Sequence, residues 1–300
     1  MTQIPSQNSS TNILKGGKRL SGIEKTSPVP VISIITVVYN GEAHLEQTIE
    51  SVISQDYPNF EYIIVDGGSQ DQTLEIVKRH QSQIDYWISE PDKGIYNAMN
   101  KGIALAKGEI IGILNSDDYY QENTVSKVVE CFAKTKADIV HGNVDRLNEI
   151  KGKKYFITVT PNLERLNQTM TINHPACFVK KKVYKKIGGF DESFRLAADY
   201  EFLLRAYKQN CQFHHLDQSL TVFRIGGESS IGCDSLKETH RLSEKHNTGY
   251  QNQIKLQLYK CYLKAPFRAL LYSLTKLFHL QFLFDKRIEN RWKKMGKYQY

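Results

Sequence analysis

The sequence predicts an α/β protein with a mostly parallel central sheet covered by helices, and three observations favour this class. Short apolar runs rich in β-branched residues recur at residues 31–40, 60–66 and 110–114, as expected of strands buried on both faces. Segments with helical spacing separate them, so strand and helix alternate across residues 31–118. The composition, 40% hydrophobic and 24% charged over 300 residues, is typical of a folded chain with a sizeable core.

The elements of the first half follow in a regular order. The first strand precedes a helix in which Leu45, Ile49 and Val52 share one face. The second strand stops at Asp66, and Gly108 is a good C-terminal residue for the third helix. The expected strands are 31–40, 60–66, 84–92 and 109–118, and the expected helices are 41–55, 72–83 and 94–108.

The second half is less regular. We expect a helix at 124–135, strands at 137–145 and 153–160, a strand and a helix within 176–194, and a helix at 197–210 that starts near Asp199. On that last helix Arg205 is expected to form a salt bridge on the helix face rather than to bind a ligand. Residues 1–29 are rich in Ser, Asn, Gln, Lys and Gly and lack the apolar core of a secretory signal, which favours a flexible leader.

The positive charge lies in the C-terminal part. The chain carries a net charge of +8, and residues 251–300 contain eleven Lys or Arg against two Asp or Glu. Residues 265–284 form an apolar stretch just long enough to span a bilayer, but Arg268 and Lys276 would each cost roughly 2.5–3.5 kcal/mol near its centre. An amphipathic helix at the membrane surface fits better, so residues 255–300 are expected to contact anionic headgroups. The alternative is a helical hairpin packed on the body of the protein.

The five cysteines, Cys131, Cys177, Cys211, Cys233 and Cys261, are scattered and odd in number. No CxxC pair occurs, so the spacing indicates neither a zinc site nor a disulfide framework. A reducing, cytosolic setting is the simplest interpretation.

Polar residues follow every strand of the first half: Asn40, then Asp66, then Glu90 with Asp92, then Asp117 with Asp118. The carboxyl ends of parallel strands meet at one edge of the sheet, where ligands bind in such folds. One polar strand end is ordinary, but four at one edge predict a binding site.

The adjacent Asp117 and Asp118 are the most informative of these residues. Alone, Asn-Ser-Asp-Asp is a good turn sequence. Like charges side by side repel, but a divalent cation held by one or two carboxylates and a substrate diphosphate would remove that cost. Lys93 and Gly94 precede a helix, whose N-terminus favours phosphate. The chain lacks G-x-G-x-x-G and Walker A motifs, which argues against a nicotinamide dehydrogenase or a P-loop enzyme.

Five blocks in order resemble glycosyltransferase family 2: ISIITVVYN, YIIVDGGSQDQT, DKGIYNAMNKGIALAKGEIIGILNSDD, NHPACFVKKKVYKKIGGFDESF and AADYEFLLR. The resemblance covers about residues 31–225 and is strongest to bacterial members that build exopolysaccharide, capsule or lipopolysaccharide. It implies a GT-A fold and transfer of a sugar, with inversion, from a nucleotide-diphosphate donor. It also implies a divalent cation, Mn²⁺ or Mg²⁺.

The resemblance also assigns residues. Asp199 matches the catalytic acidic residue, which would act as the base toward an acceptor hydroxyl. Asp118 would bind the metal together with Asp117, and Asn115 stands where relatives more often have Asp. His174 and Arg224 would contact the acceptor or the diphosphate. The nucleotide sugar would be bound by Val38, Tyr39, Asn40, Asp66, Gly67, Asp92, Lys93, Asn97, Asn115 and Asp117.

The expected organisation is a leader at 1–29, a catalytic domain at 30–235 and a helical, amphipathic, basic extension at 236–300. Within the catalytic domain, about 30–120 would bind the nucleotide sugar and about 121–235 the acceptor. The expected function is an inverting transferase of cell-surface polysaccharide or glycolipid synthesis, using a UDP- or GDP-sugar and an acceptor sugar or glycolipid. It would act in the cytoplasm, peripherally at the inner face of the plasma membrane.

Two other functions remain open. The first is a non-catalytic nucleotide-sugar-binding member of the same fold, which is favoured by Asn115 at a position where relatives more often have Asp. The second is a nucleic-acid binder that uses the basic tail. The body has no recognisable nucleic-acid motif, so no nucleic-acid partner is expected.

Overall fold

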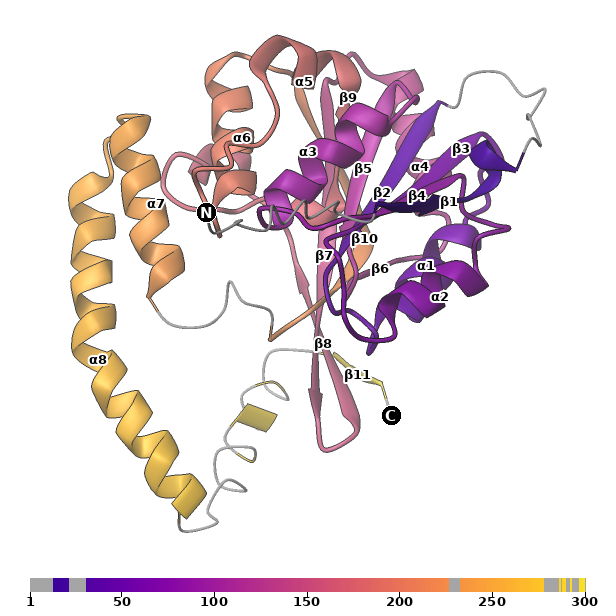
Figure 1. Cartoon of the computed structure of the whole chain (residues 1–300). Coiled ribbons are helices and arrows are strands. Elements are labelled where there is room, and N and C mark those ends of the chain that lie inside the picture. Colours follow the sequence, from indigo (N-terminus) through magenta and orange to yellow (C-terminus); the bar gives the residue numbers. More distant parts are fainter. Residues whose placement is uncertain are drawn as a thin grey trace, which may run out of the picture.

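The computed structural model describes residues 13–21, 31–226 and 233–277, together with 286, 288, 289, 292 and 297–299. A central sheet carries helices on both faces, α7 lies next to α6, and α8 packs on the far side of α7 (Figure 1). The strand order is β1-β4-β3-β2-β5-β9-β7-β10-β6, and β8 extends from β7 to pair with β11.

The strands are β1 (Leu14–Gly16), β2 (Ile32–Val38), β3 (Phe60–Asp66), β4 (Tyr86–Ser89), β5 (Ile110–Asn115), β6 (Tyr119–Tyr120), β7 (Ile139–Ile150), β8 (Lys153–Val159), β9 (Cys177–Lys180), β10 (Phe213–Arg224) and β11 (Lys297–Gln299). The α-helices are α1 (Leu45–Ile53), α2 (Thr73–Arg79), α3 (Ile95–Leu105), α4 (Thr124–Lys134), α5 (Lys181–Ile187), α6 (Ala198–Lys208), α7 (Asp234–Lys245) and α8 (Gln251–Leu277). Short 3₁₀ turns occur at Lys18–Leu20, Leu163–Arg165 and His174–Ala176.

The strands of the first half form the predicted parallel unit. β4, β3, β2 and β5 are mutually parallel, whereas β9 runs antiparallel between β5 and β7. The registers pair Val38 with Asp66 and Asp66 with Ser89, and Val37 with Asn115. The carboxyl ends of four strands therefore lie at one edge, and the predicted α/β class with a mostly parallel sheet is confirmed.

The core lies on both faces of the sheet. Along β2, Ile35 and Val37 join the apolar cluster under α3, α5 and α6, while Ile32 and Ile34 join the cluster under α1, α2 and α4. Each fully buried side chain of this size contributes about 1.5–3 kcal/mol relative to an exposed one. Burial on both faces explains why the strand reads as a continuous apolar run rather than an alternating one.

Strand β10 was not predicted. Its sequence, FHHLDQSLTVFR, is polar over the first half, and full burial is confined to Leu220–Val222. It lies parallel to β7 and antiparallel to β6, with irregular register between Leu216 and Thr221. Pairing with neighbours on both sides supplies the backbone hydrogen bonds that side-chain hydrophobicity does not signal. The strand ends at Arg224, which therefore lies beside Asp118 at the carboxyl ends of the parallel strands.

The expectation of a flexible leader is wrong for residues 13–21. β1 adds an antiparallel strand to the edge of β4, and Arg19 donates to the buried carboxylate of Glu61 and to the Leu105 carbonyl. Gly16 is needed there, because a Cβ atom would lie 2.5 Å from the Trp87 ring. Neither contact leaves a pattern within residues 1–29, since both partners are distant in sequence. The remaining residues of the expected leader lie outside the described part of the chain.

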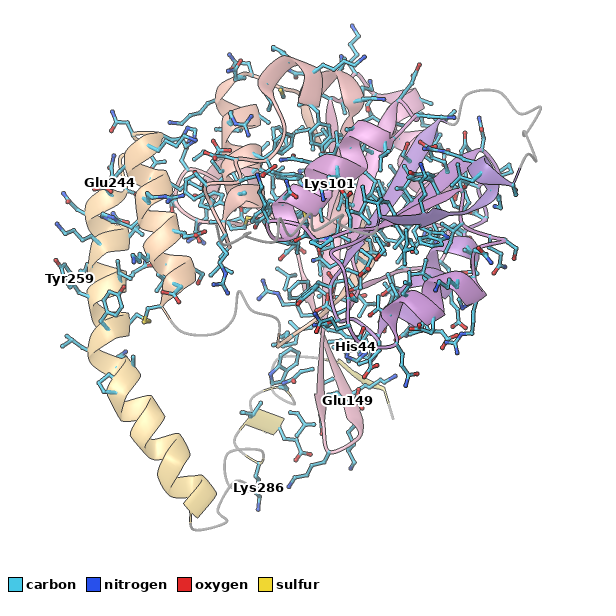
Figure 2. The ribbon with its side chains drawn as sticks, in the orientation of Figure 1. His44, Lys101, Glu149, Glu244, Tyr259 and Lys286 are labelled. Atoms are coloured by element: carbon cyan, nitrogen blue, oxygen red, sulfur yellow. A yellow bond between two sulfur atoms is a disulfide. The ribbon has the colours of Figure 1, made fainter. Side chains whose placement is uncertain are left out.

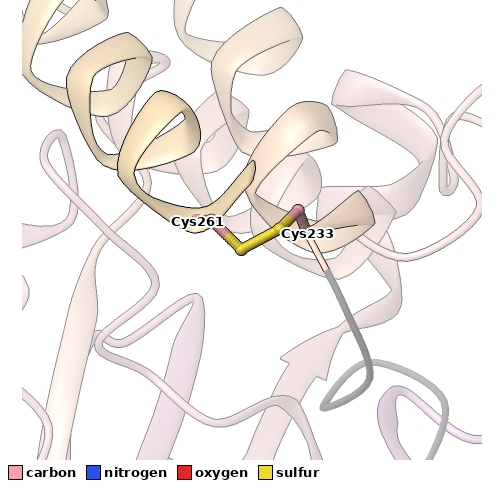
Figure 3. Close-up of a disulfide and its surroundings, with 2 residues drawn as sticks. All are labelled: Cys233 and Cys261. Atoms are coloured by element: carbon pink, nitrogen blue, oxygen red, sulfur yellow. A yellow bond between two sulfur atoms is a disulfide. The ribbon is translucent and has the colours of Figure 1, made fainter. Parts of the chain in front are cut away.

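The expectation that the cysteines form no disulfide is also wrong. Cys233, just before α7, is bonded to Cys261 of α8, with Cα atoms 5.9 Å apart (Figure 3). The pair is created by the packing of two helices against each other, which a count and a local spacing cannot reveal. Cys131, Cys177 and Cys211 are free and buried.

The C-terminal part is helical over α7 and α8, as expected, but Lys297–Gln299 form the strand β11, which pairs with β8. The boundary expected after residue 235 falls inside α7, whose side chains contact the segment before α6. In the part of the chain that the structure describes, no helix is both long and apolar enough to cross a bilayer. Most of the basic stretch beyond Leu277 lies outside the described residues.

Candidate active site

The acidic pair after β5 has one inner and one outer member. Asp118 is 0% exposed, and its Oδ1 accepts the Arg224 backbone N–H at 3.1 Å. Its Oδ2 accepts from Nδ2 of Asn115 at 3.3 Å. Burial and the neighbouring charge of Asp117 raise the pKa of Asp118 well above its ordinary value. Asp118 therefore ties β5 to the end of β10.

Asp117 is partly exposed and lies near two basic side chains, those of His44 and Arg224. Burial raises its pKa, and His44 and Arg224 partly offset that effect. His44 precedes α1, and its own pKa is lowered by burial and by Arg224. Figure 2 shows His44 at the carboxyl edge of the sheet, with Glu149 farther along the β7–β8 hairpin. Arg224 also donates to Oε1 of Gln47 and lies over the Tyr119 ring, 5.6 Å from its centroid.

The donor set around Asp117 suits a hard divalent cation that takes few protein ligands. Oδ1 of Asn115 is buried without a hydrogen-bond partner, so an amide oxygen is unused beside the two carboxylates. Mg²⁺ and similar ions are commonly held by one or two carboxylates, with phosphate and water completing the shell. Within the described ranges no group of three or more His, Cys, Asp or Glu side chains forms a larger metal cluster. The residues fit a metal that is shared with a diphosphate.

The loops after β2 and β3 are tied together. The Asn40 backbone N–H donates to Oγ of Ser69 at 2.7 Å, and Oδ1 of Asn40 accepts the Gln70 N–H at 2.9 Å. Asn40 takes a left-handed conformation with φ of 49°, which Asn tolerates better than most residues. Beside it Tyr39 is 61% exposed. Val38 is buried and forms the last rung of β2. The strand thus presents an aromatic ring at the edge of the sheet.

Asp66 is buried under these loops. Its carboxylate accepts from the backbone N–H and Oγ of Ser69 and from Oγ of Ser89, the last at 2.6 Å. Asp66 is only 2% exposed, and Ser69 and Ser89 hold the two oxygens of its carboxylate. The geometry makes Asp66 the anchor of the loop.

Gly67 makes room for Asp92. A Cβ atom on Gly67 would lie 2.5 Å from Oδ2 of Asp92, so a carboxylate approaches the backbone closely at this glycine. Oδ1 of Asp92 accepts the Gly94 N–H at 2.7 Å, and the Lys93 N–H donates to Oδ1 of Asn97 at 3.3 Å. These contacts shape the start of α3, and Nδ2 of Asn97 reaches Glu192 at 3.0 Å.

Asp199 lies in the first turn of α6, as predicted. Its Oδ1 accepts from the Tyr96 hydroxyl and from the Tyr200 N–H, both at 2.9 Å. Among the described residues, no hydrogen bond to Oδ2 is present, so one oxygen is fixed and the other is free. His174 is buried beside this group, edge-on to Phe190, and burial lowers its pKa while the charge of Asp199 opposes the shift.

The predicted residues fall into three neighbouring groups at one edge: Asn115, Asp117, Asp118 and Arg224; Tyr39, Asn40, Asp66, Gly67, Asp92 and Lys93; and Asp199, His174 and Asn97. Gly41 lies between the first two groups. Its N–H donates to Thr73 after β3, and a Cβ atom on it would lie 3.0 Å from Oγ of Ser116 after β5. Arg205 pairs with Glu201 at 2.8 Å, as expected, away from the site.

Sequence reasoning missed His44, Gln47 and Tyr96. His44 directly precedes α1, Gln47 lies on α1 and Tyr96 lies on α3. The apolar pattern of these helices predicts the helices but gives no sign that these three residues belong to a site. An aromatic hydroxyl on α3 and a carboxylate on α6 are also 103 residues apart. Only the fold brings the partners together, and no motif would have identified them.

A model of glycosyl transferase family 2 matches residues 33–188. An uncharacterized glycosyltransferase of Mycobacterium tuberculosis is 36% identical over 185 residues, which are 59% of this chain and 69% of the relative. A PGL/p-HBAD biosynthesis glycosyltransferase of Mycobacterium bovis is 30% identical over 184 residues, covering 59% and 70%.

Two solved structures share the fold at low identity. TarS of Staphylococcus aureus, in complex with UDP-GlcNAc, superposes with a TM-score of 0.58 at 20% identity, covering 76% of this chain and 71% of that one. The mannosyltransferase PcManGT of Pyrobaculum calidifontis, in complex with GDP-Man and Mn²⁺, gives 0.60 at 16% identity and covers 89% of both chains. With this GT-A architecture and the family match over residues 33–188, the chain belongs to glycosyl transferase family 2.

Proposed function

We propose that this chain transfers a sugar, with inversion, from a nucleotide-diphosphate sugar to an acceptor hydroxyl. The observation that carries the proposal is Asp199. One oxygen of its carboxylate is held by Tyr96 and by the start of α6, and the other oxygen is free. A carboxylate fixed in this way is suited to receive a proton at a defined position.

The reaction is a single displacement. The acceptor oxygen attacks the anomeric carbon, the bond from that carbon to the donor phosphate breaks, and the nucleoside diphosphate leaves with the bonding electrons. The hydroxyl proton passes to Oδ2 of Asp199. No second carboxylic acid is needed, because the leaving diphosphate is stable without protonation at the bridging oxygen.

The diphosphate side is assigned to Asp117, Asn115 and Arg224. Mn²⁺ or Mg²⁺, when bound there, would neutralise negative charge on the leaving group. Asp117 is assigned the main metal contact because it is partly exposed, whereas Asp118 is fully buried. This reverses the order of the pair expected from the family resemblance. Asp118 would instead fix the Arg224 backbone, so that the guanidinium stays beside the diphosphate.

The nucleotide is assigned to the loops after β2, β3 and β4. The exposed ring of Tyr39 offers a stacking face, Asp92 and Gly67 shape the wall, and Lys93 supplies a point charge for phosphate. TarS and PcManGT are solved with UDP-GlcNAc and GDP-Man, respectively. We therefore propose a UDP- or GDP-sugar as donor. His174, buried next to Asp199, would line the acceptor side.

The acceptor is proposed to be a glycolipid or growing polysaccharide reached at a membrane surface. α8 has two faces. Ile254 is buried, whereas Leu256, Tyr259 and Leu263 lie at positions i, i+3 and i+7 on the opposite face and are exposed, Leu263 by 72%. Lys255, Lys260 and Lys264 occur along the same helix. An apolar stripe with lysines suits anionic headgroups.

Vesicle sedimentation tests this membrane contact. The wild type should sediment with vesicles that contain phosphatidylglycerol and less with neutral ones, and Leu256→Ser/Leu263→Ser should remain in the supernatant. If the double variant sediments like the wild type, the apolar stripe of α8 does not contact the membrane.

The proposed location is the inner face of the plasma membrane, in synthesis of a cell-surface polysaccharide or glycolipid. The Mycobacterium bovis relative bears the name of a PGL/p-HBAD biosynthesis glycosyltransferase, which is consistent with that class. Because stable disulfides are rare in reducing compartments, the redox state of the Cys233–Cys261 pair in cells tests this location. Trapping thiols by acid quench in cells that produce the protein would settle the location: alkylatable Cys233 and Cys261 are expected if it is cytoplasmic.

Donor turnover tests the proposal as a whole. Purified protein is incubated with a panel of UDP- and GDP-sugars, Mn²⁺ or Mg²⁺ and a lipid extract, and nucleoside diphosphate release and lipid-linked sugar are measured. Proton NMR of the product should show the anomeric configuration opposite to that of the donor. Metal-dependent donor binding without hydrolysis or transfer would favour the non-catalytic alternative.

A further inference from the structure

The carboxylate of Glu238 on α7 holds the segment that leads into α6. Its Oε1 accepts the Arg195 backbone N–H at 2.8 Å, and its Oε2 accepts those of Leu196 and Ala197 at 2.7 and 3.0 Å. Three consecutive N–H groups thus converge on one side chain more than 40 residues later in the chain. Glu238 also lies outside the stretch matched by the family model, residues 33–188.

This contact resembles a helix cap at its last donor, the N–H of Ala197. The first N–H groups of a helix have no partner within it, and a side chain at the N-cap usually accepts from them. The N-cap residue of α6 is Ala197, which has no side-chain acceptor. Glu238 fixes the N–H groups just before and at this position from a neighbouring helix, with a charged acceptor that strengthens each hydrogen bond.

Two other residues of α7 contact the same segment before α6. Arg241 donates to the Ser193 carbonyl at 2.7 Å and lies over the Phe194 ring, 4.0 Å from its centroid. Lys245 pairs with Asp191 at 2.7 Å. On the other side, Asn100 of α3 bonds both the N–H and the carbonyl of Phe190. The path of residues 190–197 is therefore set between α3 and α7.

The start of α6 carries Asp199, two residues after the last N–H that Glu238 holds. The Tyr96 hydroxyl reaches Asp199 from α3 at 2.9 Å. A shift of the start of α6 would lengthen that hydrogen bond and move the free Oδ2. Misplacement of a reacting group by about 1 Å can cost about 100-fold in rate.

We propose that Glu238 is a positioning residue, which acts through the start of α6 to place the carboxylate of Asp199 for proton transfer. This inference rests on the proposed role of Asp199 as the base. It makes α7 part of the catalytic machinery rather than part of a separate extension.

The test is steady-state kinetics of Glu238→Ala and Glu238→Gln in the full chain. The Ala variant should lower kcat about 10- to 100-fold while the KM for the donor sugar stays near the wild-type value. The Gln variant should fall between, since one of its two terminal atoms no longer accepts.

Glu244→Ala is the matched control. Glu244 is also on α7 and lies at the outer surface (Figure 2), where its one ion pair with a described residue is the contact with His240. It should leave both kcat and the KM for the donor sugar unchanged. Glu238→Ala with a wild-type kcat, or with a lower melting temperature as its only effect, would overturn the proposal.

Asp199→Asn separates this inference from the proposed function. An inactive Asp199→Asn with a fully active Glu238→Ala would leave the base in place and remove Glu238 from the mechanism. An active Asp199→Asn would instead remove the proposed base itself.

Discussion

Glu201 offers the most quantitative test of how α6 is held against α7. Its side chain is 1% exposed and contacts nitrogen atoms of three side chains: Arg205 at 2.8 Å, His246 at 2.9 Å and Lys245 at 3.2 Å. Burial alone would raise the pKa of Glu201, but the hydrogen bonds from His246 and Arg205 outweigh it and lower the pKa from 4.5 to about 2. Glu201→Gln removes the charge and leaves its partners in place.

The shift gives the size of the effect. A lowering of about 2.5 units corresponds to about 3 kcal/mol of stability, which agrees with the roughly 3–5 kcal/mol lost when one partner of a buried ion pair is removed. Because the folded-state pKa is depressed, this contribution is fully present above the unfolded-state value of 4.5. It declines as the pH falls from there toward 2, and at pH 3 about 1.4 kcal/mol remains.

Urea unfolding of the wild type and of Glu201→Gln, from pH 7 down to pH 3, measures both quantities. The variant should be less stable by about 3 kcal/mol at pH 7, and the difference should narrow with acidification. Glu130→Gln is the control, because the exposed Glu130–Lys134 pair contributes only about 0.3–0.5 kcal/mol. A difference for Glu201→Gln below about 1 kcal/mol, or one that does not change with pH, would refute the reasoning.

Three further predictions concern the site and its support. Gly67→Ala should displace Asp92 and weaken binding of the donor nucleotide in calorimetry; unchanged affinity would mean that this wall does not touch the nucleotide. Asp117→Asn should abolish the rise in melting temperature that Mn²⁺ causes in the wild type, and an undiminished rise would place the metal elsewhere. Cys233→Ser should lower stability by about 3–4 kcal/mol, as expected for a cross-link spanning 28 residues. Reductant should do the same to the wild type, and an insensitive wild type would contradict the cross-link's role.

The parallel half of the fold was predictable because its information is local. β2, β3 and β5 are buried on both faces, so their sequences are continuous apolar runs, and the polar residues at their ends mark the carboxyl edge. The position of Asp199 at the start of α6 follows for the same reason, since a helix start is a local feature.

The features that were not predictable depend on distant partners. β10 is polar along half its length and is a strand because β7 and β6 pair with it. Residues 13–21 are ordered by the edge of β4 and by Glu61, and the disulfide requires α7 and α8 to pack together. Glu238 lies on an ordinary polar helix face, and its role cannot be inferred until the fold brings it to the three N–H groups before α6.

The central claim is that Asp199 takes the proton from the acceptor hydroxyl, and kcat for Asp199→Asn tests it most directly. The substitution keeps the shape of the side chain and an oxygen for Tyr96, but it removes the base. If Asp199 is the base, kcat of Asp199→Asn should fall by about 100- to 10,000-fold while the affinity for the donor nucleotide sugar stays at the wild-type value. A kcat within about tenfold of the wild type would contradict it.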